Sequence, residues 1–164
     1  MSHFSTRDLV SELISRSETV ATAESLTAGL LAADIASVPG ASAVLRGGLV
    51  VYATDLKASL AGVDDEILAQ YGPVAAETAI ELADGARDRC GSDWALSLTG
   101  VAGPDPQDGH QPGEVWCGVA GPHGSRAVLL PIEGQSREEI RHESASRAVQ
   151  LLLHTLRGEL PLDI

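Results

Sequence analysis

Residues 19–31 read TVATAESLTAGLL, and this stretch decides the fold. Its first part, Thr19 to Ala23, combines β-branched and small residues and predicts a short strand. The next part, Glu24 to Gly29, is small and hydroxylated as expected of a turn, and apolar residues at helical spacing, Leu31 and Ile35, follow it. A strand, a tight turn and a helix in this order present free backbone N–H groups where an anion can bind.

Helices and strands alternate along the rest of the chain. Ser5 and Asp8 predict the start of an amphipathic helix. Its predicted buried face consists of Leu9, Val10, Leu13 and Ile14. Further strands are predicted at residues 44–53, 94–98, 114–120 and 126–132, and further helices at residues 54–60, 64–71, 75–90 and 136–158. This order predicts one domain over residues 1–164, a three-layer α/β/α sandwich with a mixed β-sheet.

Two glycines interrupt the strand predicted at residues 44–53. Gly47 and Gly48 are adjacent, and glycine inside a strand indicates a bulge or a close approach of another backbone. A bend at this point could bring Ser42, in the turn before the strand, back toward Lys57, in the helix after it. The segment from Asp105 to Pro112 is polar and rich in proline and glycine, which predicts a loop.

The composition narrows the function classes. The chain has 164 residues and a formal net charge of −12, which argues against binding the phosphate backbone of nucleic acid. No apolar run approaches the length of a membrane span, so a soluble, cytoplasmic protein is expected. Cys90 and Cys117 lack the spacing of a metal site or redox motif and are expected to be reduced, buried thiols. The five histidines also lack metal-binding spacing, so we expect no metal.

Lys57 is the single lysine beside ten arginines. Arginine does not lose its proton in proteins, whereas a desolvated lysine can lose its proton and act as a base. A general base that activates a serine is therefore one role that the arginines cannot fill. The alternative is that Lys57 is an ordinary surface cation on a short helix.

The order of several motifs resembles one known family. These motifs are TAESLTAGLL at 22–31, VPGASAVLRGGLVVYATDLK at 38–57, GVDDEILAQYGPV at 62–74, TGVAGPD at 99–105 and GEVW at 113–116. Together they resemble the C-terminal domain of the competence/damage-inducible protein CinA, over roughly residues 5 to 157. That family's activity is nicotinamide-nucleotide amidase.

The resemblance implies a reaction and the residues that perform it. The substrate would be nicotinamide mononucleotide, hydrolysed at its carboxamide to nicotinate mononucleotide and ammonia in pyridine-nucleotide salvage, with no metal and no cofactor. The family's serine in the P-G-x-S turn falls on Ser42 as nucleophile, and its lysine falls on Lys57 as base. Its active-site tyrosine falls on Tyr52, for which a half-buried strand residue is the alternative interpretation.

The resemblance also implies substrate-binding residues. Ser25, Thr99 and Gly100 match positions of the family's substrate pocket, where they would serve the phosphate or the developing oxyanion. Arg137 matches the arginine of a glycine-aspartate-arginine segment. It would supply a local positive site that a strongly acidic protein needs for an anionic nucleotide. For Arg141, one turn further along, we expect an exposed ion pair with Glu138 or Glu139.

The sequence departs from the family pattern at a few positions and leaves alternatives open. Leu26 and Ala28 replace a cysteine and a glycine, and Gln135 and Ser136 lengthen the segment before Arg137. These departures bear on substrate range. The alternatives are a catalytically silent nucleotide-binding module and an amidase for a related small amide. We expect the stand-alone form of the domain, because Met1 shortly precedes the first helix, and a homo-oligomer.

Overall fold

The computed structural model describes residues 5–159, which form a five-stranded sheet against helices. The strands are β1 (Val20–Glu24), β2 (Leu45–Val50), β3 (Trp94–Gly100), β4 (Val115–Gly121) and β5 (Gly124–Leu129). Their order in the sheet is β2-β1-β3-β4-β5. β1 runs parallel to β2 and β3, whereas β4 is antiparallel to β3 and to β5. The predicted mixed sheet is confirmed.

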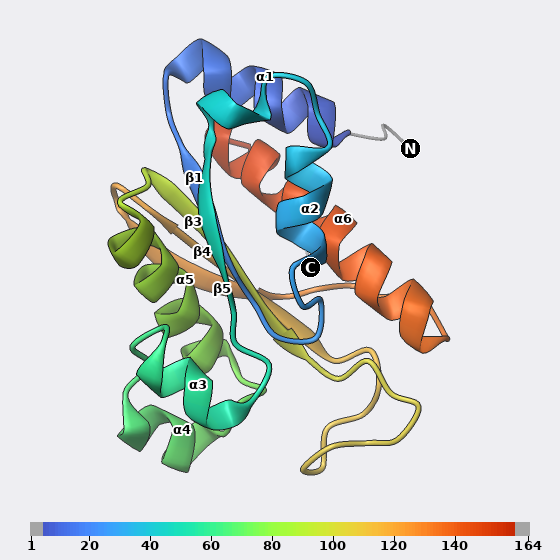
Figure 1. The fold of residues 1–164 in the computed structure, drawn as a ribbon. Helices are drawn as coiled ribbons and strands as arrows, with labels where there is room; N and C mark the ends of the chain where they lie inside the picture. The colour runs from blue at the N-terminus through green and yellow to red at the C-terminus, as the bar shows by residue number, and fades with distance from the viewer. Residues whose placement is uncertain (1–4, 160–164) are drawn as a thin grey trace.

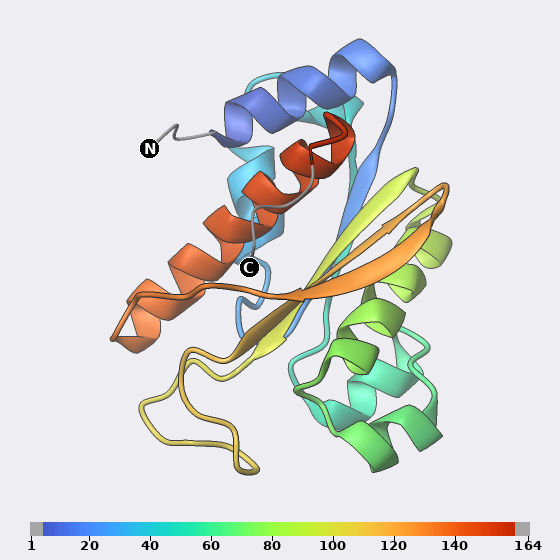
Figure 2. The same cartoon turned by 180° about the vertical axis from the view of Figure 1, so that it is seen from behind.

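Helices cover both faces of this sheet (Figures 1 and 2). One face carries α1 (Thr6–Arg16), α2 (Leu30–Ala36) and α6 (Arg137–Leu156), and the other carries α3 (Thr54–Ser59), α4 (Asp65–Tyr71) and α5 (Ala76–Cys90). A single 3-10 turn, η1 (Ala41–Ala43), precedes β2. The architecture is therefore the predicted three-layer α/β/α sandwich.

Two hydrophobic clusters fill the two spaces between the layers. The larger one joins α1, α2 and α6 to the sheet through leucine, isoleucine and valine side chains. The smaller one is rich in alanine and packs α5 against the other face. The prediction for α1 was wrong at one residue, because Ile14 is 46% exposed beside the turn at Gly40, while Leu9, Val10 and Leu13 are buried.

The local signals in the sequence explain where several elements begin and end. Capping boxes at Ser5 and Ser136 start α1 and α6, and the Asp64 side chain accepts a bond from Glu66 N–H at the start of α4. A tight hairpin at Gly121 and Gly124 extends β4 by one residue and β5 by two residues at the turn, and β5 ends at Leu129, three residues earlier than predicted.

The glycine pair in β2 lies at a bulge, the first of the two alternatives expected of it. The register against β1 passes from Leu45, opposite Val20, to Gly47, opposite Ala21, so that Arg46 is an extra residue. Gly48 lies against β1, because a Cβ atom there would stand 2.6 Å from the Thr22 hydroxyl. β2 stays paired along β1 beyond this bulge and does not bend back on itself.

We expect Gly85→Ala to destabilise the protein, although alanine normally stabilises the interior of a helix by about 1 kcal/mol. Gly85 lies in α5, and a Cβ atom there would stand 1.8 Å from the Ala61 carbonyl oxygen. Backbone must move to relieve that contact, at a cost of roughly 1–3 kcal/mol. Urea denaturation measures the change in unfolding free energy, and a stabilised variant would contradict this packing.

The expectation for the two cysteines is borne out only in part. Cys90 and Cys117 are both free thiols, but only Cys117 is fully buried, and burial raises its pKa to about 12. Cys90 is half-buried, at the end of α5.

Within residues 5–159, no helix combines the length and the apolar character needed to cross a lipid bilayer.

Candidate functional site

The carboxyl ends of the three parallel strands meet at one edge of the sheet, the lower edge in Figure 1. Ser25 directly follows β1, Lys57 lies in α3 just after β2, and Thr99 and Gly100 end β3. These residues line a pocket of about 140 Å³. Open α/β sheets commonly bind ligands at this edge, because several loops converge there. Residues from distant parts of the sequence thus share one site.

A buried serine and lysine form the floor of this pocket. Lys57 Nζ lies 3.0 Å from Ser25 Oγ, and both side chains are buried, with Lys57 only 1% exposed. None of the ion pairs within residues 5–159 includes Lys57. Removal of the amine from water therefore lowers the pKa of Lys57 from 10.5 to about 8. The alternative of an exposed surface cation is wrong.

The remaining partners of Lys57 orient its amine. Nζ donates to the Val51 carbonyl oxygen at 2.8 Å and to the Tyr52 carbonyl oxygen at 3.3 Å. A neutral amine has two N–H donors and one lone pair. With both donors directed to these carbonyls, the lone pair of neutral Lys57 faces the Ser25 hydroxyl. The arrangement suits transfer of the serine proton to the lysine.

The turn that carries Ser25 is held in an unusual conformation. Ser25 N–H continues the pairing with β3 by donating to the Leu98 carbonyl at 2.9 Å. Ala28 and Gly29 then adopt positive φ angles of 48° and 98°, of which the first is strained for a residue with a side chain. Within residues 5–159, the amides of Leu26 and Thr27 have no hydrogen-bond acceptor. Two backbone donors thus directly follow the serine.

Tyr52 and Arg137 connect the floor of the pocket to its rim. Tyr52 is 55% exposed, and its hydroxyl accepts a bond from Arg137 Nη2 at 2.9 Å, while its own carbonyl contacts Lys57. Arg137 Nη1 also donates to the Gly103 carbonyl at 2.6 Å. The positive charge of Arg137 therefore lies about one tyrosine side chain away from the Ser25–Lys57 pair.

Thr99 and Gly100 line the pocket, but packing limits what they can contribute. The Thr99 side chain is buried, and its hydroxyl donates to the Pro73 carbonyl. This hydroxyl can accept a bond from a ligand but has no second proton to donate. A Cβ atom at Gly100 would stand 2.4 Å from the Glu114 carbonyl oxygen, so glycine here also allows β4 to approach closely.

The expected approach of Ser42 to Lys57 is wrong. Ser42 is exposed in η1, before β2, and Lys57 lies beyond the far end of that strand. β2 pairs in parallel with β1 over its length, and each strand residue advances by about 3.3 Å. Ser42 is therefore at the opposite edge of the sheet, and Ser25 takes the position beside the lysine.

The structure also adds two residues that the sequence did not single out for this site. Arg141 makes no ion pair with Glu138 or Glu139, and instead donates from Nε to the Leu26 carbonyl at 2.9 Å. The Glu24 carboxylate is buried and accepts the backbone N–H groups of Leu31 and Ala32 at 2.8 and 3.0 Å. The position of Glu24 shortly before a predicted helix could have indicated its contacts with the backbone at the start of α2.

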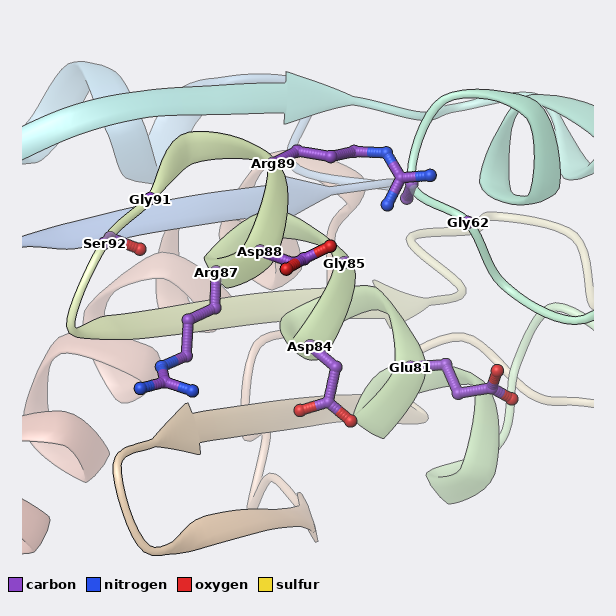
Figure 3. A pocket seen from close by; sticks show the side chains of 10 residues that line it. Gly62, Glu81, Asp84, Gly85, Arg87, Asp88, Arg89, Gly91 and Ser92 are labelled. Atoms are coloured by element: carbon purple, nitrogen blue, oxygen red, sulfur yellow. The ribbon is translucent and has the colours of Figure 1, made fainter.

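A larger hollow of about 730 Å³ lies elsewhere, along α5 and its flanking segments. Figure 3 shows Arg89 extending toward Gly62 and the acidic side chains of Glu81, Asp84 and Asp88 along the helix. It mixes both charge signs and contains no lysine beside a hydroxyl. Chemically, the smaller pocket at the sheet edge is the better candidate.

Among residues 5–159, no three histidine, cysteine, aspartate or glutamate side chains form a metal-binding group.

The fold and the site together define an α/β protein with a serine–lysine pocket at the carboxyl edge of its parallel strands. The chain belongs to the CinA C-terminal domain family, whose model matches residues 3–156. It is 47% identical over 148 residues to a CinA-like protein of Frankia casuarinae, covering 89% of this chain and 34% of that protein.

Solved structures agree with this assignment. The competence/damage inducible protein CihA from Agrobacterium tumefaciens is 31% identical with a TM-score of 0.83, over 93% of this chain and 95% of that one. A CinA superfamily protein from Klebsiella pneumoniae is 26% identical with a TM-score of 0.88, over 93% and 98% of the two chains. The chain spans about a third of the length of the curated relatives it matches.

Proposed function

We propose that the protein is a nicotinamide-nucleotide amidase, which hydrolyses nicotinamide mononucleotide to nicotinate mononucleotide and ammonia. The observation that carries this proposal is the buried contact of 3.0 Å between Lys57 Nζ and Ser25 Oγ. A nucleophile within hydrogen-bond reach of a base with a lowered pKa is the arrangement required for covalent acyl transfer. Ser25 replaces Ser42 as the nucleophile in this proposal.

The reaction follows from the placement of these two groups. Neutral Lys57 takes the proton of Ser25 as Oγ attacks the carboxamide carbon, which gives a tetrahedral oxyanion. The C–N bond then breaks, the Lys57 ammonium returns the proton to the leaving nitrogen, and ammonia departs from an ester on Ser25. A water molecule, deprotonated by Lys57, attacks the ester, releases the carboxylate product and restores the Ser25 hydroxyl.

Backbone amides next to the nucleophile support the oxyanion step. Leu26 lines the pocket, and its N–H group directly follows Ser25 and has no acceptor within the described residues. Preorganised amide donors of this kind stabilise the charge that develops on the carbonyl oxygen. Loss of one such donor typically lowers the rate by about 10²–10³-fold. We assign the Leu26 amide this role and leave the Thr99 hydroxyl the role of an acceptor.

The charge distribution along the pocket supports a substrate with an amide at one end and a phosphate at the other. The floor holds the reacting pair, and Arg137 brings a guanidinium to the rim. Two of the five N–H groups of Arg137 are used by the Gly103 carbonyl and the Tyr52 hydroxyl, so others can bind phosphate oxygens. Tyr52 contacts both of these groups, Lys57 through its carbonyl oxygen and Arg137 through its hydroxyl.

The direct test is to incubate the purified protein with nicotinamide mononucleotide and to measure ammonia and nicotinate mononucleotide together with binding. Equal amounts of both products support the proposal. Binding without products would instead favour a catalytically silent nucleotide-binding module of the family. A panel of nicotinamide, nicotinamide riboside, glutamine and asparagine tests the remaining alternative, and turnover of one of these without turnover of the nucleotide would refute the proposed substrate.

Arg137→Ala is expected to raise KM for nicotinamide mononucleotide by about 10–100-fold, because a charged hydrogen bond to phosphate is lost. The change in KM for nicotinamide riboside, which lacks the phosphate, should be within about threefold. Steady-state kinetics on both substrates measure this difference. Arg147→Ala is the matched control, since Arg147 lies on the same helix and, among residues 5–159, forms an ion pair with Glu143 alone. Equal losses on both substrates would contradict phosphate binding by Arg137.

A further inference from the structure

We infer that Arg141 is a positioning residue that holds the peptide planes after Ser25 in the orientation needed for catalysis, an inference that rests on the proposed function. Arg141 lies in the second turn of α6. Its guanidinium donates from Nε to the Leu26 carbonyl at 2.9 Å and from Nη2 to the Thr27 carbonyl at 3.3 Å. One planar side chain thus holds two successive peptides.

These contacts fix the direction of backbone donors as well as acceptors. In a trans peptide the C=O and N–H groups point in opposite directions. When Arg141 holds the Leu26 carbonyl, the Thr27 N–H must therefore point away from α6. The preceding amide, that of Leu26, belongs to the adjoining peptide plane and shares the same turn. Neither amide has an acceptor in the described part of the chain. The Ala28 N–H donates to the Ser25 carbonyl at 3.0 Å and so restrains the peptide plane that carries the Leu26 N–H, whereas Arg141 restrains the next plane, which carries the Thr27 N–H. Arg141 therefore holds the Leu26 amide from the plane that adjoins it.

The turn needs such a restraint because its conformation is strained. Ala28 has a φ angle of 48°, which residues with a side chain rarely adopt. The buried Thr27 hydroxyl has no hydrogen-bond partner among residues 5–159. Both features favour rearrangement of the turn. Backbone bonds within the turn oppose it, from Ala28 N–H to the Ser25 carbonyl and from Leu30 N–H to the Thr27 carbonyl, both at 3.0 Å. The side chains that add to them are Arg141 on one side and Glu24, through its contacts with the start of α2, on the other.

Arg137 and Arg141 connect α6 to two different loops of the pocket. They lie four residues apart on this helix, so their side chains share one face. Arg137 contacts the loop that follows β3, through the Gly103 carbonyl, and Arg141 contacts the turn that follows β1. The two loops line the same pocket. Arg137 lines the pocket and is placed to bind substrate, whereas Arg141 does not line it and donates to backbone carbonyls.

The test compares Arg141→Gln, Arg141→Lys and the control Arg147→Gln in the full chain. For Arg141→Gln we expect kcat for nicotinamide mononucleotide to fall by about 10²-fold, as for loss of an oxyanion donor, with KM within about threefold. Lysine offers a single point charge in place of a planar fork, so Arg141→Lys should recover only part of this loss. Arg147→Gln should leave kcat unchanged, and thermal melts verify that each variant is folded.

Hydrogen exchange supplies a measurement that does not depend on turnover. Peptides covering residues 24–31 should exchange faster in Arg141→Gln and Arg141→Lys than in wild type, and at the wild-type rate in Arg147→Gln. Unchanged exchange, or faster exchange with an unchanged kcat, would overturn the positioning role. A fall in affinity with kcat preserved would overturn it as well, by making Arg141 a binding residue. Wild-type protein that releases no ammonia would overturn the proposed function instead, while the exchange result still decides whether Arg141 holds the turn.

Discussion

Ser25→Ala is expected to reduce ammonia release from nicotinamide mononucleotide by at least about 10³-fold, because the variant has no nucleophile to form the ester. The Ser25 hydroxyl is the group 3.0 Å from the amine of Lys57. Substrate affinity should change little, since the phosphate contact proposed for Arg137 remains. Steady-state kinetics and a binding measurement, carried out on the same preparation, separate these two effects.

Ser42→Ala is the matched control, because it removes the same atom from the serine at the opposite edge of the sheet. Ser42 is exposed, and we expect its variant to keep kcat and KM within about twofold of wild type. The pair of variants also distinguishes the two candidate nucleophiles. An inactive Ser42→Ala beside an active Ser25→Ala would refute the assignment made from the geometry and restore the one implied by the family resemblance.

Much of the fold could be predicted because its signals are local. The turn residues 24–29, the glycine pair in β2 and the capping boxes at Ser5 and Ser136 each act on a few neighbouring residues. Alternation of strands and helices then predicts the layers. Ile14 was placed wrongly because helical spacing cannot tell how far a neighbouring turn covers the end of α1.

The pairing within the site could not be predicted, because it depends on which end of each strand reaches the pocket. Ser42 is closer to Lys57 in sequence than Ser25 is, and a bend at the glycine pair would have brought it near. The parallel register of β1 and β2 rules out that bend and places Ser25, which is 32 residues away in sequence, beside the amine. Strand direction is a property of the whole sheet and has no local signal.

Arg141 illustrates a second limit of sequence reasoning. Acidic residues three and two positions before it made a surface ion pair the simplest interpretation, since such pairs are common on helices. Its actual partners are backbone carbonyls more than a hundred residues away. Carbonyl groups are present at every position and carry no signature in the sequence, so only the packing of α6 against the turn reveals this contact.

Lys57→Arg is expected to reduce kcat/KM at pH 7 by at least about 10³-fold, because arginine keeps its proton and cannot act as the base. Lys57→Met should be equally inactive, because methionine has a similar volume and no basic group. This second variant is needed because the larger arginine could fail to fit the buried site. Circular dichroism and thermal melts verify that both variants fold. Near-normal turnover by either variant would refute the role of Lys57 as the base.

The pH dependence of the wild type tests the same residue without a mutation. The pKa of Lys57 is about 8, so roughly a tenth of the molecules hold the neutral amine at pH 7. We expect kcat/KM to rise about tenfold for each pH unit below 8 and to level off above it. A profile that is flat between pH 6 and 9 would contradict a lysine base with this pKa.

Stability should follow the same protonation with a predictable sign. Burial lowers the pKa of Lys57 in the folded protein from 10.5 to about 8, so between these pH values the unfolded chain binds a proton that the folded protein does not. The free energy of unfolding therefore rises with pH across this window, by about 3 kcal/mol for a pKa lowering of this size. Lys57→Met lacks this group, so the difference between wild type and variant in urea denaturation isolates the contribution of Lys57. If the unfolding free energies of wild type and variant changed equally from pH 8 to 10, the amine would not be desolvated. The lowered pKa on which the proposed base depends would then have no physical cause.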